Sequence, residues 1–343
     1  FGLLTLLVTK ERITSIMGVI SIACVWVILE WFRLFWLMGL SFNLSGMALA
    51  STLYSLQFAS IGGVYFLSFW VILTNLMFLR WVSLKRSLIL FIACAITPYV
   101  FGLLQVKMHE VNQVPFLNAL LIQPSFAVEE DKGFQQMDLE KKVAYVMSEW
   151  GEIAHLVQNN EKADIIILPE SVVPFASTSC LFPENLARTL LEKIFSKKNS
   201  WKADPPFLKT YHFEGMNHIF ACNGYFAQSI AEMTETPVLI GMEHSEGNDF
   251  YSSGLLYVPK QGEQYRYDKQ VLLPMAEYIP FQWLQEAAKR YGINGSFTHG
   301  KGAKLFELKG MQCGVNICYE ETMGNIVRQN KQLGGHVLIN LTN

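Results

Sequence analysis

Three long apolar stretches dominate the first third of the chain. Residues 13–29 carry no charge, and residues 61–79 and 88–106 form two more such stretches, each bounded by charged or polar residues. A helix of about 20 apolar residues can cross a bilayer core that is about 30 Å thick. The pattern therefore predicts three membrane-spanning helices, within a transmembrane region that we place at residues 1–110.

Basic residues next to these stretches predict their orientation. The segment 80–86, between the second and third stretches, holds three basic residues and no acidic one. Short loops rich in lysine and arginine stay on the cytoplasmic side of a membrane. Lys10 and Arg12, just before the first stretch, agree with that orientation. We therefore expect everything after Lys107 to lie on the outer side.

The segment between the first two stretches allows more than one interpretation. Residues 30–60 include a run rich in tryptophan and phenylalanine, which forms either an interfacial helix or a further pair of short crossings. Glu30 and Arg33 lie three positions apart, so on a helix they share a face and neutralise each other. We prefer a structural ion pair, with recognition of lipid headgroups or lipoprotein as the alternative.

Beyond residue 110 the pattern changes to mixed α/β. Residues 116–124 are predicted as a strand, residues 138–157 show helical spacing, and residues 165–168 form a second strand. Strand, helix and strand in this order predict an α/β sheet, which carries functional side chains at the carboxyl ends of its strands. We expect this domain to occupy residues 111–343, with residues 175–212 as an excursion between core elements.

Three strand ends carry side chains with useful chemistry. Cys318 ends a buried strand over residues 314–317, Glu170 follows the strand over residues 163–168, and Lys269 begins an apolar run. A cysteine is a nucleophile only as a thiolate, so a neighbouring base must take its proton. The three residues together suit acyl transfer, with Glu170 as the base, Cys318 as the nucleophile and Lys269 opposite the oxyanion of the tetrahedral intermediate.

Taken singly, each of these residues has an ordinary structural explanation. A cysteine after an apolar strand is commonly a small buried residue. A lone glutamate after a strand is equally a solvated loop carboxylate or a helix cap, and a lone lysine is usually a surface charge. Residue type and position therefore leave both interpretations open.

Composition supports a membrane protein and gives no support for nucleic-acid binding. The 343 residues are 51% hydrophobic and 16% charged, with a positive mean hydropathy, which is too apolar for an ordinary soluble domain. The 27 basic and 29 acidic residues nearly balance, so there is no strong positive charge to attract a nucleic acid. The chain starts at Phe1 inside an apolar run and stops just after a strand-like segment, so we expect it to be part of a longer protein.

The six cysteines show no spacing typical of a metal site, and we expect neither a metal nor another cofactor. Cys24 and Cys94 fall within predicted spans, where packing is the simplest interpretation. Cys180 and Cys222 are candidates for a disulfide in an oxidising outer compartment, and the sequence leaves their pairing open.

Short motifs around the three strand ends resemble those of a known family. Leu-Pro-Glu-Ser surrounds Glu170, Asn-Ile-Cys-Tyr-Glu surrounds Cys318, and Asp-Lys at Lys269 is followed by a Pro-x-x-Glu-Tyr-x-Pro element. The residues of that element are Pro274, Glu277, Tyr278 and Pro280. In this order the blocks resemble the Glu-Lys-Cys triad of the nitrilase superfamily. More narrowly, they are similar to the apolipoprotein N-acyltransferase family, its membrane-anchored branch.

The membrane part carries the same resemblance. The segments 29–33 and 57–65 look like blocks of that family's helical region, and residues 39–46 correspond to its Gly-Phe-Pro-Trp-Asn block. Residues 40–42 depart from it, since Leu-Ser-Phe stands in place of Phe-Pro-Trp. Soluble nitrilases have no such helices, so the resemblance points to the membrane-anchored branch.

The resemblance implies a fold, a reaction and a cellular location. The fold is the nitrilase four-layer α-β-β-α sandwich, following transmembrane helices. The reaction moves an acyl chain from a membrane phospholipid, through a thioester on Cys318, to the α-amino group of the S-diacylglyceryl cysteine that begins an apolipoprotein. The location is the bacterial inner membrane, with the catalytic domain on the periplasmic face.

The resemblance also assigns roles to individual residues. The catalytic triad is Glu170, Lys269 and Cys318. Supporting residues are Glu277, Tyr319 and Glu320. The two supporting carboxylates are expected near the triad, where one of them orients the lysine or assists proton transfer, and the tyrosine is expected to border the lipid entry. Local ion pairing and loop packing are the alternatives for all three.

Two rival classes share these motifs. One is a membrane-tethered nitrilase-type amidase or hydrolase, which passes the acyl group to water instead of an amine. The other is a membrane scaffold that keeps the fold and has an unreactive Cys318.

Overall fold

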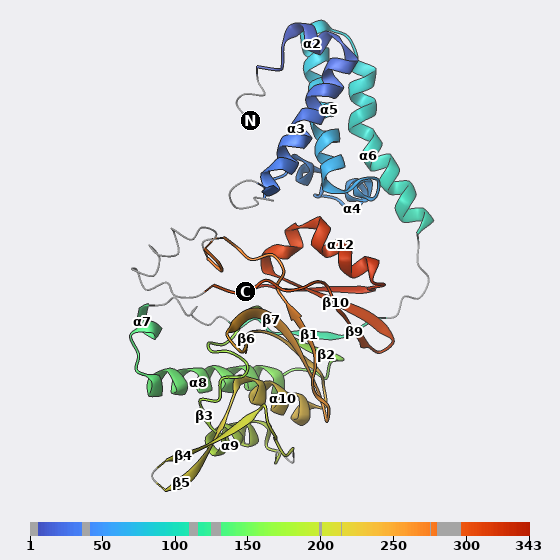
Figure 1. Ribbon diagram of the computed structural model, residues 1–343. Coiled ribbons are helices and arrows are strands. Elements are labelled where there is room, and N and C mark those ends of the chain that lie inside the picture. The colour runs from blue at the N-terminus through green and yellow to red at the C-terminus, as the bar shows by residue number, and fades with distance from the viewer. Residues whose placement is uncertain are drawn as a thin grey trace. The chain divides into compact units, whose positions relative to one another are not determined.

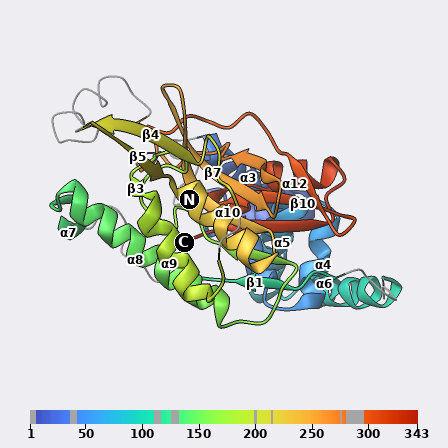
Figure 2. The same cartoon turned by 90° about the horizontal axis from the view of Figure 1, so that it is seen from below.

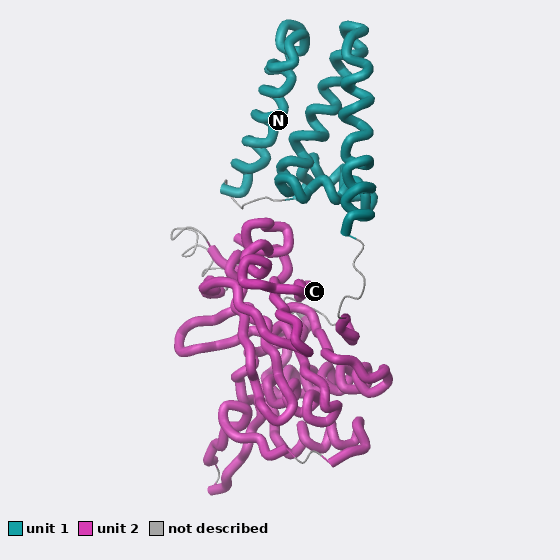
Figure 3. The backbone as a smooth tube through the Cα atoms, turned by 90° about the vertical axis from the view of Figure 1, so that its right-hand side faces the viewer, with its two compact units in different colours: residues 1–114 teal, residues 115–343 magenta. Residues whose placement is uncertain are grey.

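The computed structural model describes residues 6–35, 42–109, 116–124, 132–198, 201–213, 215–274, 276–279 and 296–343. The chain divides into two compact units, Phe1–Val114 and Pro115–Asn343, which Figure 3 shows in different colours. Each unit buries an apolar core of its own.

The first unit contains three long apolar helices among its described residues. They are α3 (Ile16–Phe32), α5 (Gly63–Leu84) and α6 (Leu88–Met108) (Figure 1). Each is long and apolar enough to cross a membrane, as the three apolar stretches predict. α3 begins at Ile16 rather than at residue 13, because Ser15 caps it and residue 13 belongs to the short helix α2 (Lys10–Thr14).

The connection between α5 and α6 is shorter than predicted. α5 continues through Arg80 to Leu84, and the Arg80 side chain is only 9% exposed. The Arg80 guanidinium donates to the carbonyl oxygens of Ile13 (2.6 Å) and Thr14. It thereby satisfies carbonyl groups that the end of α2 leaves without helical partners. The basic connection shrinks to residues 85–87, which keep two of the three basic residues.

Short helices fill the segment whose structure the sequence left open. They are η1 (Arg33–Phe35), η2 (Ser45–Leu49), α4 (Leu53–Gln57) and η3 (Phe58–Ser60). None of these is long enough to cross a membrane, so the described residues 33–35 and 42–60 add no further crossing. Residues 36–41, which include part of the family block at 39–46, lie outside the described residues.

Glu30, near the end of α3, is buried and accepts hydrogen bonds from both side chains and backbone. The donors include Trp26 Nε1 (2.9 Å), the Ser45 amide (2.9 Å) and Ser45 Oγ (2.7 Å). Arg33 donates to the carbonyl oxygen of Phe42. These contacts attach the start of the short-helix segment to α3. The predicted pairing of Glu30 with Arg33 stays a prediction.

The second unit is built on two sheets that pack against each other through an apolar cluster. The larger sheet has the order β1-β2-β6-β7-β8, with β1, β2 and β6 parallel and β6, β7 and β8 antiparallel. Its strands are β1 (Ala119–Leu121), β2 (Ile165–Leu168), β6 (Val238–Glu246), β7 (Asp249–Val258) and β8 (Gly262–Asp268). The smaller sheet has the order β11-β10-β9. Its strands are β9 (Leu305–Leu308), β10 (Met311–Ile317) and β11 (Val337–Leu341).

Helices cover the outer face of each sheet. α8 (Leu139–Gln158), α9 (Glu184–Phe195) and α10 (Asn223–Thr234) lie beside one another below the larger sheet (Figures 1 and 2). α12 (Gly324–Gln332) covers the smaller sheet, where Asn330 donates to Asn316 Oδ1 at 3.0 Å. Gly314 permits this approach, because a Cβ there would lie 2.5 Å from Asn330 Oδ1.

Alternating apolar side chains fill two separate cores. Ile166 of β2 points toward the helices, where it joins Trp150 of α8 in one buried cluster. Ile165 points the opposite way and joins Val315 of β10 in a second cluster between the sheets. This alternation follows from the period of two along a strand. The layers are helices, sheet, sheet and helix, which confirms the predicted α-β-β-α sandwich after apolar helices.

Two predicted elements differ in extent. The strand expected over residues 116–124 is limited to β1. The excursion over residues 175–212 contains regular structure, including the helix α9. This helix forms there because Ala187, Leu191 and Ile194 share one face, which is buried. Small strands within and just after this region form a third sheet of order β3-β5-β4. Its strands are β3 (Phe182–Pro183), β4 (Leu208–Phe213) and β5 (Met216–Ala221).

Candidate active site

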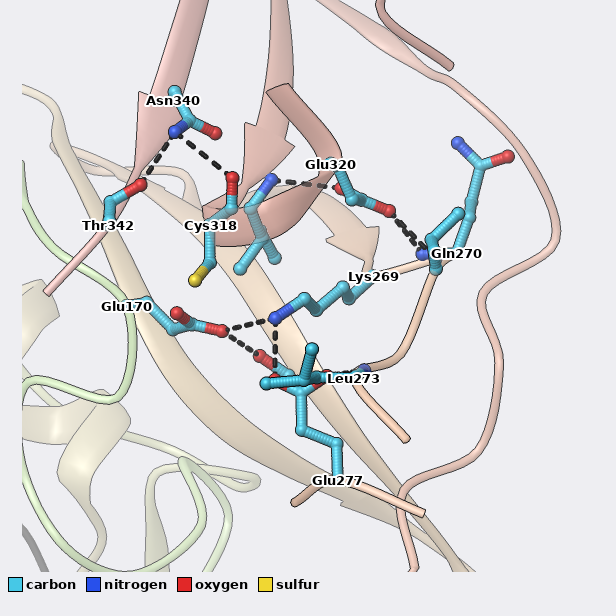
Figure 4. Close-up of polar contacts among 12 residues, drawn as sticks. Glu170, Lys269, Gln270, Leu273, Glu277, Cys318, Glu320, Asn340 and Thr342 are labelled. Atoms are coloured by element: carbon cyan, nitrogen blue, oxygen red, sulfur yellow. Dashed lines mark hydrogen bonds and ion pairs between the residues drawn. The ribbon is translucent and has the colours of Figure 1, made fainter. Parts of the chain in front are cut away.

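Cys318 occupies a sharp turn at the end of β10. The strand ends at Ile317, and Cys318 begins the short helix η4 (Cys318–Thr322) with a φ of 50°. A non-glycine residue in this left-handed region is strained, and surrounding contacts must hold it there. Asn340 on the neighbouring strand β11 supplies one, because its Nδ2 lies 3.3 Å from the Cys318 carbonyl oxygen (Figure 4).

Glu170 follows β2 directly after a proline, and the next strand makes room for it. The Gly241 amide on β6 donates to the Pro169 carbonyl oxygen at 3.1 Å. A Cβ at Gly241 would lie 2.5 Å from the Glu170 Cα, so the glycine is required for this close approach. Ser252 Oγ, on β7, reaches Glu170 Oε1 at 3.4 Å.

Lys269 comes directly after β8 and is 1% exposed. Its Nζ lies 2.8 Å from Glu170 Oε1 and 2.5 Å from Glu277 Oε1. Burial disfavours the charged amine, but the two carboxylates outweigh it and hold the pKa of Lys269 above its usual value. The site therefore contains a buried cation at neutral pH.

The Cys318 thiol points toward this cation and toward Glu170 (Figure 4). Burial, followed by the negative charge of Glu170 and a hydrogen bond with its carboxylate, raises the pKa of Cys318 to about 11. Lys269 and the Tyr319 amide oppose that increase only in part. The resting residue is therefore a neutral thiol at neutral pH, with a carboxylate beside it that can accept its proton.

Glu277 reaches the same lysine from the segment after β8. Its Oε2 accepts the Leu273 amide at 2.7 Å, while its carbonyl oxygen accepts the Phe297 amide at 2.8 Å. The carboxylate is therefore fixed on one side by the backbone and on the other by Lys269. Of the motif around it, Pro280 lies outside the described residues.

Glu320 is fully buried and does not contact the Lys269 ammonium directly. Its Oε1 accepts the amides of Gln270 (2.6 Å) and Val271 (3.1 Å), and its Oε2 accepts Tyr267 Oη (2.8 Å) and the Ile317 amide (2.9 Å). Burial raises the pKa of Glu320, and these donors oppose the increase. The residue connects the end of β10 to the segment that follows β8, so Cys318 and Lys269 are held in a fixed arrangement.

Tyr319 is the third supporting residue and is 6% exposed. Its amide hydrogen-bonds the Cys318 sulfur, where it favours the thiolate. Its predicted position at a lipid entry stays a prediction. The described residues contain no group of three or more metal-ligating side chains.

The structure places Lys269 and Cys318 in contact with Glu170, and two further residues, which the sequence motifs do not include, support this arrangement. These are Asn340 and Gly241. The sequence carries a sign of both positions. Asn340 is a polar residue, and Gly241 a residue without a side chain, in strands that are otherwise apolar around them.

Two family models match this chain. Residues 134–343 match the carbon-nitrogen hydrolase family, and residues 1–77 match the apolipoprotein N-acyltransferase N-terminal domain. Because the first match spans more than half of the sequence, the chain belongs to the carbon-nitrogen hydrolase family. The two matches together confirm the resemblance that the motifs carry.

Curated relatives of this chain carry the name apolipoprotein N-acyltransferase. The chain is 25% identical over 358 residues to an apolipoprotein N-acyltransferase from Chlamydia pneumoniae, a match that covers 100% of this chain and 61% of the relative. It is 28% identical over 339 residues to the one from Chlamydia trachomatis, covering 93% of this chain and 57% of the relative. The chain thus spans about three-fifths of the length of these relatives.

Solved structures of the same superfamily are more distant. An amidase from Nesterenkonia sp. has 13% identity and a TM-score of 0.38, with 68% of this chain and 67% of the amidase covered. A CN-hydrolase superfamily protein from Xanthomonas campestris has 15% identity and a TM-score of 0.32, with 60% and 55% covered.

Proposed function

We propose that this chain belongs to an apolipoprotein N-acyltransferase, which moves an acyl chain from a membrane phospholipid to the α-amino group of a lipoprotein. The single observation that carries the proposal is the contact of the Cys318 thiol with Glu170, beside a Lys269 ammonium that two carboxylates hold. The names of the curated relatives supply the substrate class. Three apolar helices ahead of this site suit substrates that reside in a bilayer.

The first half of the proposed reaction loads the enzyme. Glu170 accepts the Cys318 proton as the sulfur attacks an ester carbonyl carbon of the phospholipid. Lys269 opposes the negative charge that develops on the carbonyl oxygen, and its burial strengthens that interaction. The ester bond then breaks, and the leaving alkoxide of the lysophospholipid takes the proton from Glu170. The acyl chain remains on Cys318 as a thioester.

The second half transfers the chain to an amine. The α-amino group of the diacylated apolipoprotein attacks the thioester carbonyl, and Glu170 accepts the proton that this nitrogen loses. Collapse of the tetrahedral intermediate breaks the carbon–sulfur bond, and Cys318 leaves with that proton. A buried lysine and a half-buried cysteine limit the access of water to the waiting thioester.

The supporting residues act through the triad in this proposal. Glu277 fixes the position of the Lys269 ammonium through the 2.5 Å contact. Glu320 is a positioning residue, because it joins the backbone at Ile317 to the backbone at Gln270. The Tyr319 amide favours the thiolate while the proton moves.

The proposed setting is the bacterial inner membrane, with the catalytic unit on the periplasmic side. The relatives and the apolar helices support a bacterial membrane protein. Lys85 and Arg86 between α5 and α6 support this side, because short loops rich in basic residues stay in the cytoplasm.

The test of this proposal observes both half-reactions with the whole chain in phospholipid–detergent micelles. Incubation with phospholipid labelled in its acyl chain should give a covalent acyl adduct on the Cys318 peptide by mass spectrometry. Adding a diacylated lipopeptide should then move the label to its amino terminus. Cys318→Ala should lose the adduct, whereas Cys313→Ala, which changes a buried cysteine on the preceding strand β10, should keep it.

Other outcomes identify the rival classes. Label released as free fatty acid with none on the lipopeptide would replace the transferase proposal with a hydrolase. A Cys318 that forms no adduct and resists alkylating probes would favour the scaffold.

A further inference from the structure

Cys180 and Cys222 meet at one end of the small third sheet. Cys180 lies just before β3 and Cys222 directly follows β5. The two strands pair antiparallel with Phe182 opposite Ala221, so the ladder leads both cysteines to the same end. Each Sγ lies 3.9 Å from the Pro206 carbonyl oxygen. The two thiols therefore share one acceptor.

Backbone hydrogen bonds restrain both sides of this pair. The Gly224 amide donates to the Ser177 carbonyl oxygen at 3.0 Å, which joins the start of α10 to the segment that leads to Cys180. The Cys222 amide donates to the Phe207 carbonyl oxygen at 3.1 Å. The two cysteines are consequently held close to each other by the surrounding backbone and not by their side chains alone.

The two thiols differ in exposure and in acidity. Cys180 is partly exposed and lines a cavity of about 560 Å³ together with Lys209, whereas Cys222 is 2% exposed. A hydrogen bond with Cys222, together with the charge of Lys209, lowers the pKa of Cys180 against the effect of burial. The same contact and burial raise the pKa of Cys222. Cys180 is thus the accessible and more acidic thiol of the pair.

We propose that Cys180 and Cys222 form a second reactive-thiol site, separate from Cys318, which closes to a disulfide by exchange with a small-molecule or protein disulfide. The Cys180 thiolate attacks one sulfur of the donor, whose disulfide bond breaks and releases one donor thiolate. Cys222 then loses its proton and attacks the Cys180 sulfur, and the mixed disulfide breaks to release the second donor thiolate. Two electrons pass from the cysteine pair to the donor, and the two thiol protons end on the donor thiols.

This site goes beyond the proposed acyl transfer and has its own structural consequence. The bridge would close a loop that contains α9 and β4. It would also fix the segment before Cys180, which continues from Glu170 in the connection between β2 and β3. Because a cross-link restricts the unfolded chain more than the folded one, the oxidised protein should melt at a higher temperature than the reduced protein.

The experiment uses the purified whole chain in detergent, first reduced and then exposed to oxidised glutathione. After denaturation and blocking of the remaining thiols with N-ethylmaleimide, the digest is analysed by mass spectrometry without reductant. We expect a linked Cys180–Cys222 peptide that is lighter by two hydrogen atoms than its two reduced parts. Neither cysteine should then carry N-ethylmaleimide. Cys313 serves as an internal reference and should carry N-ethylmaleimide.

Variants test the order of the two steps. Cys222→Ala should trap glutathione on Cys180, because no second thiol can release it. Cys180→Ala should leave Cys222 without glutathione. If Cys180→Ala folds poorly, Cys180→Ser takes its place. Cys313→Ala is the matched control and should keep the linked peptide. Wild-type protein that carries N-ethylmaleimide on both cysteines after oxidation would overturn the proposal, as would glutathione trapped on Cys222 alone. The acyl adduct on Cys318 is measured separately. Failure of the disulfide proposal is therefore distinguishable from failure of the acyl-transfer proposal.

Discussion

Replacing Glu170 with glutamine should make the Cys318 thiol more acidic and, at the same time, slow acyl transfer. The Glu170 charge and its hydrogen bond contribute to the raised pKa of Cys318, about 11, while the Lys269 charge opposes them. The amide removes the negative charge and keeps the side-chain shape. Lys269 retains its second carboxylate, Glu277, at 2.5 Å, so its charge stays in place. The pKa of Cys318 should therefore fall.

The size of the effect follows from the thiolate population. With a pKa of about 11, roughly one Cys318 in 3,000 is a thiolate at pH 7.5. Each tenfold gain in thiolate brings roughly a threefold gain in alkylation rate, because a less basic thiolate is also a weaker nucleophile. We expect Glu170→Gln to alkylate about three to ten times faster at Cys318. Acyl transfer should fall about 10²- to 10⁴-fold, which is the usual contribution of a general base.

The assay follows iodoacetamide labelling of the Cys318 peptide by mass spectrometry between pH 7 and pH 10. In the wild type the rate should rise with pH without a plateau, because the whole range lies below the pKa; in Glu170→Gln the curve should shift to lower pH. Glu307→Gln, which removes an exposed carboxylate on β9, is the matched control and should leave both measurements unchanged. A variant whose alkylation and acyl transfer fall in parallel would refute the assignment of Glu170 as the base.

Three further substitutions test the surroundings of the triad. Glu277→Gln removes one of the charges that raise the pKa of Lys269, so the alkaline limb of the pH–activity profile should move to lower pH; an unchanged limb would contradict the role of this contact. Glu320→Gln presents an amide NH₂ to backbone and tyrosine donors in a fully buried position, and denaturant unfolding in detergent should show a loss of about 2–4 kcal/mol. A loss below about 0.5 kcal/mol would show that these hydrogen bonds are replaced by others. Gly241→Ala would place a Cβ 2.5 Å from the Glu170 Cα, so adduct formation on Cys318 should drop while the helical circular dichroism stays constant; full activity would mean that the strand moves aside without cost.

The site shows where local sequence patterns suffice. Glu170 and Cys318 each follow a strand whose β-branched and apolar residues are recognisable without partners, and the polar residue after each strand marks its end. The motifs around them then indicate that the two strands belong to one site. Asn340 and Gly241 escaped this reasoning, because their importance lies in the distance to a backbone atom of a residue remote in sequence.

The membrane unit shows the same division. Apolar stretches of about 20 residues predict a spanning helix by length and composition alone, since a bilayer core has a fixed thickness. The sequence predicts Arg80 in a loop, because charge normally interrupts such a helix. In the structure Arg80 lies inside α5, where its guanidinium donates hydrogen bonds to the carbonyl oxygens of Ile13 and Thr14.

The sequence by itself indicated the three apolar helices, the change to an α/β pattern near residue 110 and the three side chains that we propose for catalysis. These features depend on local hydrophobic periodicity, strand ends and short motifs, which are written in neighbouring residues. Tertiary structure alone decided that Lys269 is shared by Glu170 and Glu277, that Glu320 joins two strand ends, and that Cys180 and Cys222 share an acceptor. Such contacts arise only when two sheets and their connections pack together, because hydrogen bonds and charges act across distances of a few ångströms in space, whatever the separation along the chain.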